Sequence, residues 1–399
     1  MLKSRLIIIS ILAIGALVAI KFNIKPNNST LTDFGTTHED GIEKSYYSDK
    51  TIRTETPYVN GLRNGVVKNY YHGGSVKSEQ TYVDGKLNGQ TTTYYPNGNI
   101  EKIYTYDNGM LNGPAKSYNE DGFLVSETEF KNNVQFNQEI GYYPSGKTRY
   151  IFDLDENGLV TGTMKEFYEN GNISSETSFT AGKENGVKND YAEDGSIRHS
   201  TEYSQGVIEG SILAYDENGH VISEFNYLNG RLDGPSFLYY PDNSVKEHIN
   251  FTDNLHEGSY KKFSEKGIMI FDAFYVHDKL EGLMRLFYDS GKPYAELSYH
   301  NNVPDGKATM WYENGNLLSE AIYNKGILQG WQTIYNHQGK PIAALQKEGL
   351  KTSYVKIDND GNRAPMTDEE IIRLRNNILK TVLGTEKNKM IETIVGKNE

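Results

Sequence analysis

Acidic residues recur at one position of this 399-residue chain, and paired carboxylates are the groups that glycoside hydrolysis requires. They lie fourteen residues after a repeating glycine: Glu55, Glu79, Glu127, Glu176, Glu224, Asp272, Glu296 and Glu320. Hydrolysis needs two carboxyl groups about 5 to 10 Å apart with different pKa values. Copies of one residue in one repeated environment give no reason for such a difference. We therefore expect a repeated structural role, such as pairing with lysines or turn amides, and keep hydrolysis of cell-wall glycans through Glu176 and Glu224 as an alternative.

The histidines are the next candidates for chemistry, because imidazole binds metal ions. The nine are His38, His72, His199, His220, His248, His256, His277, His300 and His337. No two have metal-ligand spacing, and His256, His277 and His300 are expected about 10 Å apart at one edge of successive repeats. We predict solvated turn residues. The segment Asp358–Gly361 resembles the start of an EF-hand, but its glycine comes too early, so we predict a loop.

Composition narrows the classes of protein further. The chain has no cysteine, so it has neither disulfides nor thiolate metal sites. Its net charge of -12 repels phosphate backbones, so nucleic acid is not an expected partner. Phosphate-binding glycine loops, dinucleotide fingerprints and nucleophile elbows are absent from the sequence. We expect no enzyme activity, no catalytic residues, no cofactor, no metal and no small-molecule substrate.

The N-terminal residues have the pattern of an export signal. Lys3 and Arg5 precede an almost wholly apolar run from Leu6 to Ile20. We predict a signal peptide or signal-anchor helix over residues 1–25 and a polar linker over 26–38, and whether the signal is cleaved stays open. The protein is then extracytoplasmic, either secreted or attached to the membrane by this segment.

The candidate residues belong to a repeat of 24 residues. Its reference position is Gly41 in the first copy and Asn137 in the fifth, and a 25-residue step follows Asn137 because one residue is inserted between Gly146 and Gly158. The remaining copies carry the predicted turn glycines Gly65, Gly89, Gly113, Gly162, Gly186, Gly210, Gly234, Gly258, Gly282, Gly306 and Gly330. Thirteen copies span residues 39–345.

An aromatic residue follows the reference position by five residues in every copy. This aromatic ladder is Tyr46, Tyr70, Tyr94, Tyr118, Tyr142, Phe167, Tyr191, Tyr215, Tyr239, Phe263, Phe287, Trp311 and Tyr335. Aromatic residues are only 12% of the chain, so thirteen in thirteen copies is no accident. We expect each ring to pack against its equivalents in the adjoining copies.

Glycine, asparagine or aspartate also recurs nine and twenty residues after the reference position, as in Gly98 and Gly109, and these residue types tolerate positive φ. Between these positions polarity alternates with period two, so Ser175 and Thr177 face one side and Glu176 the other. Each copy is predicted to be a strand, a tight turn, a strand and a looser turn. The expected fold is all-β: an elongated, single-layer antiparallel ribbon of β-hairpin repeats.

The tail, residues 346–399, changes character. Thr367 and Glu370 form a capping box before an amphipathic stretch, which predicts a helix at about 368–383. This helix is expected either to cap the last sheet edge or to dock a partner.

The repeat resembles the MORN family, in the variant found in bacterial antitoxin-like proteins of the YwqK type. The matching segments are GKLNGQTTTYYPNGNIEKIYTYDNG from Gly85 to Gly109, GRLDGPSFLYYPDN and GNLLSEAIYNKGILQG. The resemblance implies a single-layer antiparallel sheet that acts as a scaffold or binding surface, with an antitoxin or immunity role in some members and contact with proteins or membrane lipids in others.

These observations favour an exported or membrane-anchored, non-catalytic scaffold that binds a protein or cell-surface partner through its aromatic-rich ribbon. The alternative is a YwqK-type immunity protein that neutralises a toxin by direct binding.

Overall fold

The computed structural model describes residues 38–349 and 351–382. The predicted signal segment at 1–25 and all of the predicted linker except His38 lie outside the described residues. Contacts divide the chain into two compact units, one from Thr37 to Ile342 and one that includes the residues from Ala343 onward. Each is described by itself.

The repeats are hairpins of two strands. The first strand of each hairpin is β1 (Gly41–Tyr46), β4 (Gly65–Tyr70), β6 (Lys86–Tyr94), β9 (Gly113–Tyr118), β11 (Val134–Tyr142), β13 (Val160–Phe167), β15 (Lys183–Tyr191), β17 (Val207–Tyr215), β20 (Gly234–Tyr239), β22 (Leu255–Phe263), β25 (Gly282–Phe287), β27 (Val303–Trp311) and β30 (Trp331–Tyr335). The second is β2 (Ile52–Val59), β5 (Val76–Val83), β7 (Ile100–Asp107), β10 (Leu124–Lys131), β12 (Thr148–Leu154), β14 (Ile173–Thr180), β16 (Ile197–Ser204), β18 (Val221–Leu228), β21 (Val245–Thr252), β23 (Met269–Val276), β26 (Pro293–His300) and β28 (Leu317–Asn324). β31 (Pro341–Glu348) follows β30 in the chain. Two-residue strands precede some first strands: β3 (Leu62–Arg63), β8 (Met110–Leu111), β19 (Arg231–Leu232), β24 (Lys279–Leu280) and β29 (Ile327–Leu328).

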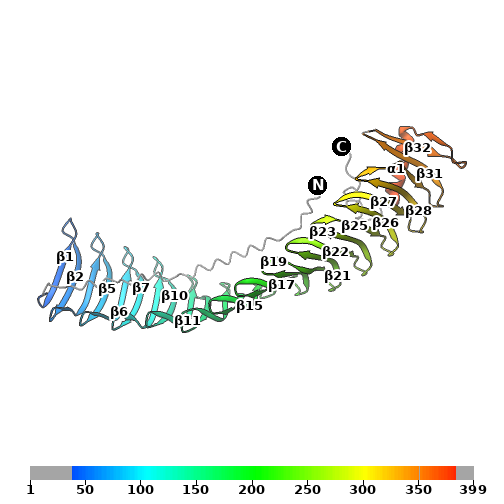
Figure 1. Ribbon diagram of the computed structural model, residues 1–399. Helices are drawn as coiled ribbons and strands as arrows, with labels where there is room; N and C mark the ends of the chain where they lie inside the picture. Colours follow the sequence, from blue (N-terminus) through cyan, green and yellow to red (C-terminus); the bar gives the residue numbers. More distant parts are fainter. Residues whose placement is uncertain (1–37, 350, 383–399) are drawn as a thin grey trace. The chain divides into compact units, whose positions relative to one another are not determined.

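Within the first unit, strands pair antiparallel with their neighbours in the chain, as β4 does with β5 and β5 with β6 (Figure 1). The predicted antiparallel ribbon of hairpins is therefore confirmed. Each residue of the aromatic ladder is the last residue of the first strand of its hairpin.

The two turns of the repeat differ in length, but in the opposite sense to the prediction. The turn within a hairpin has three residues, His72 to Gly74 in the second copy, closed by hydrogen bonds from Tyr71 N to Ser75 O and from Gly74 N to Tyr71 O. The turn between hairpins is the tighter one. Asn60 and Gly61, with φ of 50° and 73°, connect the directly paired Val59 and Leu62, which is a type I′ hairpin turn.

The predicted turn glycines at the reference position lie at β-bulges instead of turns. In β6, Leu87 pairs with Tyr82 and Thr91 pairs with Gln80, so residues 88–90 lie opposite Thr81 alone. Gly89, in the middle, has φ of 101°, a conformation that only glycine adopts without strain. Positive φ was predicted only for the positions nine and twenty residues later, so its occurrence at these glycines is a new finding. Their assignment to turns was wrong, because the extra residues are absorbed at a bulge between paired strands.

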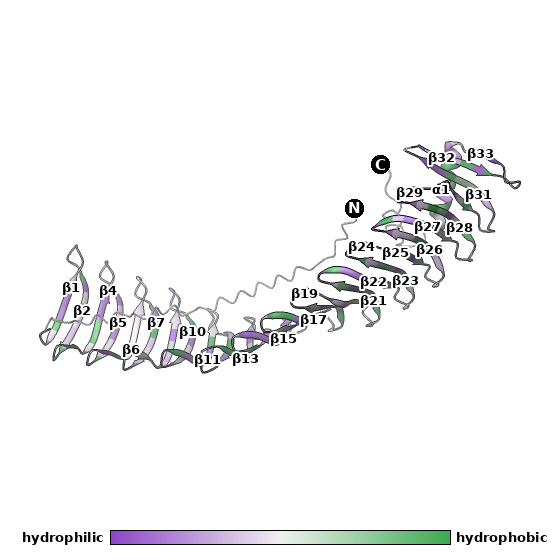
Figure 2. Ribbon diagram, in the orientation of Figure 1, coloured by the Kyte–Doolittle hydropathy of each residue, from purple (hydrophilic) through white to green (hydrophobic). Residues whose placement is uncertain are grey.

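The strands have one buried and one more exposed face, in the alternation expected of a sheet. In β10, Ser126, Thr128 and Phe130 are buried. Glu127 is half-buried and Glu129 is exposed on the opposite side, which we call the glutamate face. Figure 2 shows the resulting mixture of hydrophobic and hydrophilic residues along the strands.

In the second unit, the part of β31 from Ala343 pairs with β32 (Lys351–Ile357), which pairs with β33 (Arg363–Pro365). The helix α1 (Asp368–Val382) follows, where the sequence predicts one. Its capping box is formed: Thr367 N donates to Glu370 Oε2 at 2.9 Å, and Glu370 N donates to Thr367 Oγ1 at 3.3 Å. None of the helices in the described residues is long and apolar enough to cross a membrane.

Candidate functional site

The recurring glutamates join neighbouring hairpins. In the first copies, Glu55 accepts a hydrogen bond from the hydroxyl of Tyr70, the ladder residue of the following copy, and forms an ion pair with Lys44 of its own copy. Tyrosine partners at 2.5 to 3.0 Å are found for Glu55, Glu79, Glu127, Glu176 and Glu224. Lysine partners at 2.8 to 3.3 Å are found for Glu55, Glu79, Glu127 and Glu176. The expected lysine pairing is therefore present, and the ladder supplies a second partner.

The last three carboxylates of the column pair with cations instead of tyrosines. Arg285 lies 3.1 Å from Asp272 and 3.4 Å from Glu296, and Lys307 lies 2.5 Å from Glu320. The carboxylate fourteen residues after the reference position thus joins neighbouring strands either through a tyrosine hydroxyl or through an arginine or lysine.

The electrostatics of this network favour the ionised form of Glu55, Glu79 and Glu127. The hydrogen bond from Lys68 holds the pKa of Glu79 below its usual value, and the hydrogen bond from Tyr142 does the same for the pKa of Glu127. On the other side of the contact, the hydrogen bond to Glu55 raises the pKa of Tyr70 to about 12. A general acid needs the opposite shift, a raised carboxyl pKa. The lowered pKa values of Glu79 and Glu127 therefore fit ionised carboxylates that hold neighbouring repeats together.

Ladder residues contact the neighbouring copy through hydrogen bonds instead of ring stacking. Among the described residues, no ring contact joins two members of the ladder. One strand lies between the strands of successive members, so two strand spacings place them about 9.6 Å apart, beyond the 4.5 to 7 Å of ring contacts. The glutamate instead links the ladder tyrosine of one copy to a lysine of the copy before it, as Glu55 links Tyr70 to Lys44.

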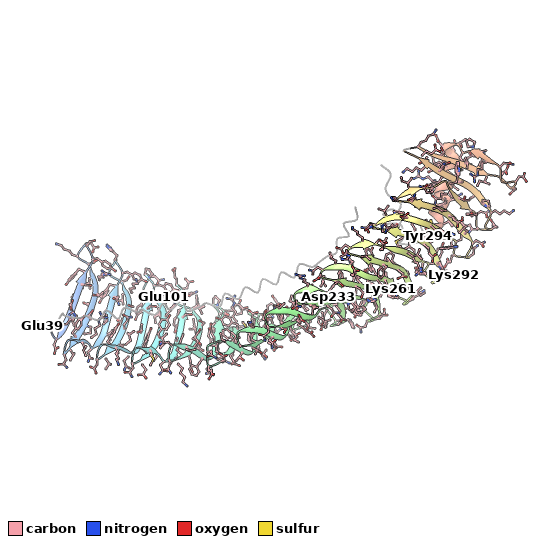
Figure 3. All side chains as sticks on the ribbon, in the orientation of Figure 1. Glu39, Glu101, Asp233, Lys261, Lys292 and Tyr294 are labelled. Carbon is pink, nitrogen blue, oxygen red and sulfur yellow. The ribbon has the colours of Figure 1, made fainter. Side chains whose placement is uncertain are left out.

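A second tyrosine position makes an equally regular contact, and the sequence analysis missed it. Six residues after the reference position, a tyrosine hydroxyl donates to the main-chain carbonyl of the ladder residue in the next copy. This bond, 2.6 to 2.9 Å long, is made by Tyr47, Tyr71, Tyr95, Tyr143, Tyr168, Tyr240, Tyr288 and Tyr312. Turn residues add similar links: Lys292, labelled in Figure 3, donates to the carbonyl of Glu313 at 3.0 Å. The signal was the tyrosine pair, as in Tyr70-Tyr71, which recurs along the chain.

Six of the nine histidines each lie within 4.0 Å of one carboxylate: His38, His72, His220, His256, His277 and His300. His256 Nδ1 lies 2.8 Å from Asp278, and His300 Nδ1 lies 2.8 Å from Glu281. His277 and His300 are exposed near turns, as predicted, but His256 is not, because its ring packs 4.7 Å from that of Phe251. The described part of the chain contains no group of three or more residues that could hold a metal ion.

Asp358 lies in a turn, as predicted. Its side chain accepts hydrogen bonds from the main-chain nitrogens of Asp360 and Asn362 at 3.0 and 2.8 Å. This is an aspartate-stabilised turn.

Aliphatic side chains stay exposed along the type I′ turns. In β10, Lys131 lies on the glutamate face, and its directly paired neighbour is Val134, so both share that face. Equivalent positions in the first four copies, together with Leu159 beside the longer turn of the fifth copy, form what we call the aliphatic row: Val59, Leu62, Val83, Met110, Val134 and Leu159. Between 36% and 48% of the surface of each of these residues is exposed. Val207, Leu228, Val303 and Ile327 are exposed at the same positions in later copies.

Hairpins of 24 residues joined by glutamate and tyrosine contacts define a β-hairpin repeat protein. Comparison with known families agrees. The model of the MORN repeat variant matches eight segments, residues 39–60, 63–84, 87–108, 111–132, 160–181, 208–229, 280–301 and 304–325. The chain belongs to this family.

Solved structures similar to this chain include toxin complexes. The crystal structure of TcdB2-TccC3-Cdc42 is 11% identical, with a TM-score of 0.16 over 81% of this chain and 22% of that chain. The structure of the Photorhabdus luminescens Tc holotoxin pore is 14% identical, with a TM-score of 0.14 over 85% of this chain and 16% of that chain. The chain thus spans 22% or less of the length of these chains. No curated protein matches it.

Proposed function

We propose that this protein is an exported, non-catalytic repeat scaffold that binds a protein partner along its glutamate face. The observation that carries the proposal is the aliphatic row. It keeps one or two aliphatic side chains exposed in each of five consecutive copies, and exposed apolar surface that continues over several elements is typical of interaction sites.

The tyrosine hydroxyls are bonded within the sheet, so they are not the groups that would form hydrogen bonds with a partner. The hydroxyl of Tyr94 is bonded to Glu79 and that of Tyr95 to a main-chain carbonyl, so both are engaged within the sheet. The half-buried rings and the aliphatic row remain as contact area for a partner.

The spacing of the row favours an elongated partner. Successive copies repeat at about 9.6 Å, the width of two strands. An α-helix presents residues seven apart on one side at about 10.5 Å. A helix with one apolar residue in each heptad therefore matches the row over several copies.

Export is proposed from the N-terminal pattern of Lys3, Arg5 and the apolar run that ends at Ile20. Cell fractionation with a carboxy-terminal tag tests it: we expect the protein in the membrane or extracellular fraction. Recovery in the cytoplasm alone would contradict export.

The binding surface is tested by cross-linking in intact cells. We expect the triple variant Val83→Ser, Met110→Ser and Val134→Ser to lose the cross-linked partner. The matched control changes the residues paired with these three across the same turns, Lys86, Asp107 and Lys131, to serine. Equal loss in both variants, with circular dichroism of the native type, would contradict the assignment of the row.

The immunity role implied by the family resemblance remains a prediction. A toxin-like reading frame beside the gene, and recovery of its product as the cross-linked protein, would support it.

A further inference from the structure

The first strand of the array, β1, has an open edge. In the described residues, which begin at His38, its one partner strand is β2, and all six of its residues are exposed. Ile42 and Tyr46 are 67% and 55% exposed. An open edge of this kind can pair with a strand of another chain.

The internal junctions show what fits such an edge. Where β4 follows β2, the ladder residue Tyr70 offers two groups to the preceding copy. Its carbonyl oxygen accepts from the hydroxyl of Tyr47 at 2.7 Å, and its own hydroxyl donates to Glu55 at 2.7 Å. A first strand therefore receives a tyrosine and a glutamate from the hairpin before it.

β1 retains the receiving half of this junction. It ends in Tyr46, the ladder residue of the first copy, and in the described residues no carboxylate accepts from the Tyr46 hydroxyl. Glu55 lies in β2 and accepts from Tyr70 of the second copy, so it takes part in the junction between the first and second copies.

The two ends of the array differ in their side chains. In the last copy, Asn336 stands where the donating tyrosine recurs, and Ala344 stands where the glutamate recurs. A second copy of this chain therefore lacks both side chains needed to join β1 through its last repeat.

We propose that β1 is a docking edge for a β-hairpin of the same repeat type carried by a different protein. The incoming hairpin pairs antiparallel with β1. Its tyrosine donates to the carbonyl of Tyr46, and its glutamate accepts from the Tyr46 hydroxyl. A hairpin bound in this way extends the array by one repeat, because it makes the same tyrosine and glutamate contacts that join neighbouring repeats within the chain.

Binding of a labelled hairpin to the full-length protein tests the proposal. The probe is a fluorescent peptide of residues 41–60, which contains Tyr47 and Glu55 and supplies both contacts within the array. Fluorescence anisotropy should show saturable binding. Tyr46→Phe in the protein should weaken it about tenfold, the cost of one charge-assisted hydrogen bond. The same loss is expected for Glu55→Gln in the probe, and combining both changes should add little further.

Tyr118→Phe is the matched control. Tyr118 is a ladder residue whose preceding copy has Ile103 in place of the glutamate, so its hydroxyl lacks this contact. We expect it to leave probe binding unchanged. Absence of saturable binding, or an equal effect of Tyr46→Phe and Tyr118→Phe, would overturn the proposal.

Hydrogen exchange of β1, measured on the protein without the probe, tests whether another segment of the chain or a second copy covers this edge. We expect its outward amides to exchange quickly and to become protected when the probe is added. Protection that is independent of protein concentration would mean that residues 1–37 of the same chain cover the edge, and protection that rises with concentration would mean a second copy. Either result overturns the proposal but leaves the aliphatic row untouched, because that surface is tested by different variants.

Discussion

The contact between Glu224 and Tyr239 allows the junction between two repeats to be measured. The hydroxyl of Tyr239, the last residue of β20, donates to Glu224 Oε2 on β18 at 2.9 Å. No lysine or arginine forms an ion pair with Glu224 among the described residues, so the tyrosine contact is separable from other charges.

The expected energies follow from the exposure of the pair. A hydrogen bond to a charged group contributes about 1.5 to 3 kcal/mol when shielded from water. Both side chains are only half-buried, so water competes, and we expect Tyr239→Phe to lower the free energy of unfolding by about 1 kcal/mol. Tyr239→Ala also removes the ring and should cost about 2 kcal/mol, the low end of core truncations.

The assay is a double-mutant cycle of Tyr239→Phe and Glu224→Ala in urea unfolding. Repeat arrays can open locally, so amide exchange of β18 and β20 should accompany it. We expect a coupling energy of about 0.5 to 1 kcal/mol. Tyr118→Phe is the control, because Ile103 replaces the glutamate there. Strict additivity in the cycle, or an equal cost of Tyr118→Phe, would refute the reasoning.

Three further measurements test the turns, the tyrosine network and the helix cap. Gly109→Ala should cost about 1 kcal/mol, because Gly109 has φ of 88° with open space around it, whereas Gly73→Ala, also in open space but without positive φ, should change little in urea unfolding. The pKa of Tyr70 is raised from the unfolded value of 10.0 to about 12, so the contribution of Tyr70 to stability is complete below pH 10 and is lost as the pH rises through 12. Absorbance titration at alkaline pH should show this late ionisation of Tyr70, and Glu55→Gln should lower the pKa of Tyr70. Thr367→Ala removes the capping box of α1 and should cost about 1 kcal/mol, visible as faster amide exchange in the first turn, with no effect on β1 to β30.

The hairpin repeat was predictable because glycine and aromatic side chains recur at fixed spacing, and few folds satisfy both. The turn lengths were assigned in the wrong order. Asn60-Gly61 was the signal, since two residues with positive φ make the type I′ turn, but the Pro-Asn-Gly of residues 96–98 suggested the shorter turn. The bulge at Gly89 was not predictable from spacing, because periodicity does not show which residues lack a pairing partner.

The contacts between repeats depend on strand register, which the sequence does not display. Glu55 and Tyr70 are fifteen residues apart and lie on neighbouring strands, and the bulges decide that they meet. His256 shows the same limit. It was predicted as a solvated turn residue, but its direct pairing with Phe251 places it against that buried ring.

The division between repeated and variable positions bears on how a partner would bind. The ladder is aromatic in every copy, and five of its tyrosines join neighbouring hairpins through a glutamate. Sixteen residues after the reference position, on the glutamate face, the copies differ: examples are Pro57, Thr105, Glu202, Phe274 and Ile322. A surface of identical copies would let an elongated partner slide from one repeat to the next at no cost. The residues sixteen positions after the reference position make each copy of the glutamate face chemically distinct. A partner that contacts several copies would therefore bind in one register, set by these variable residues.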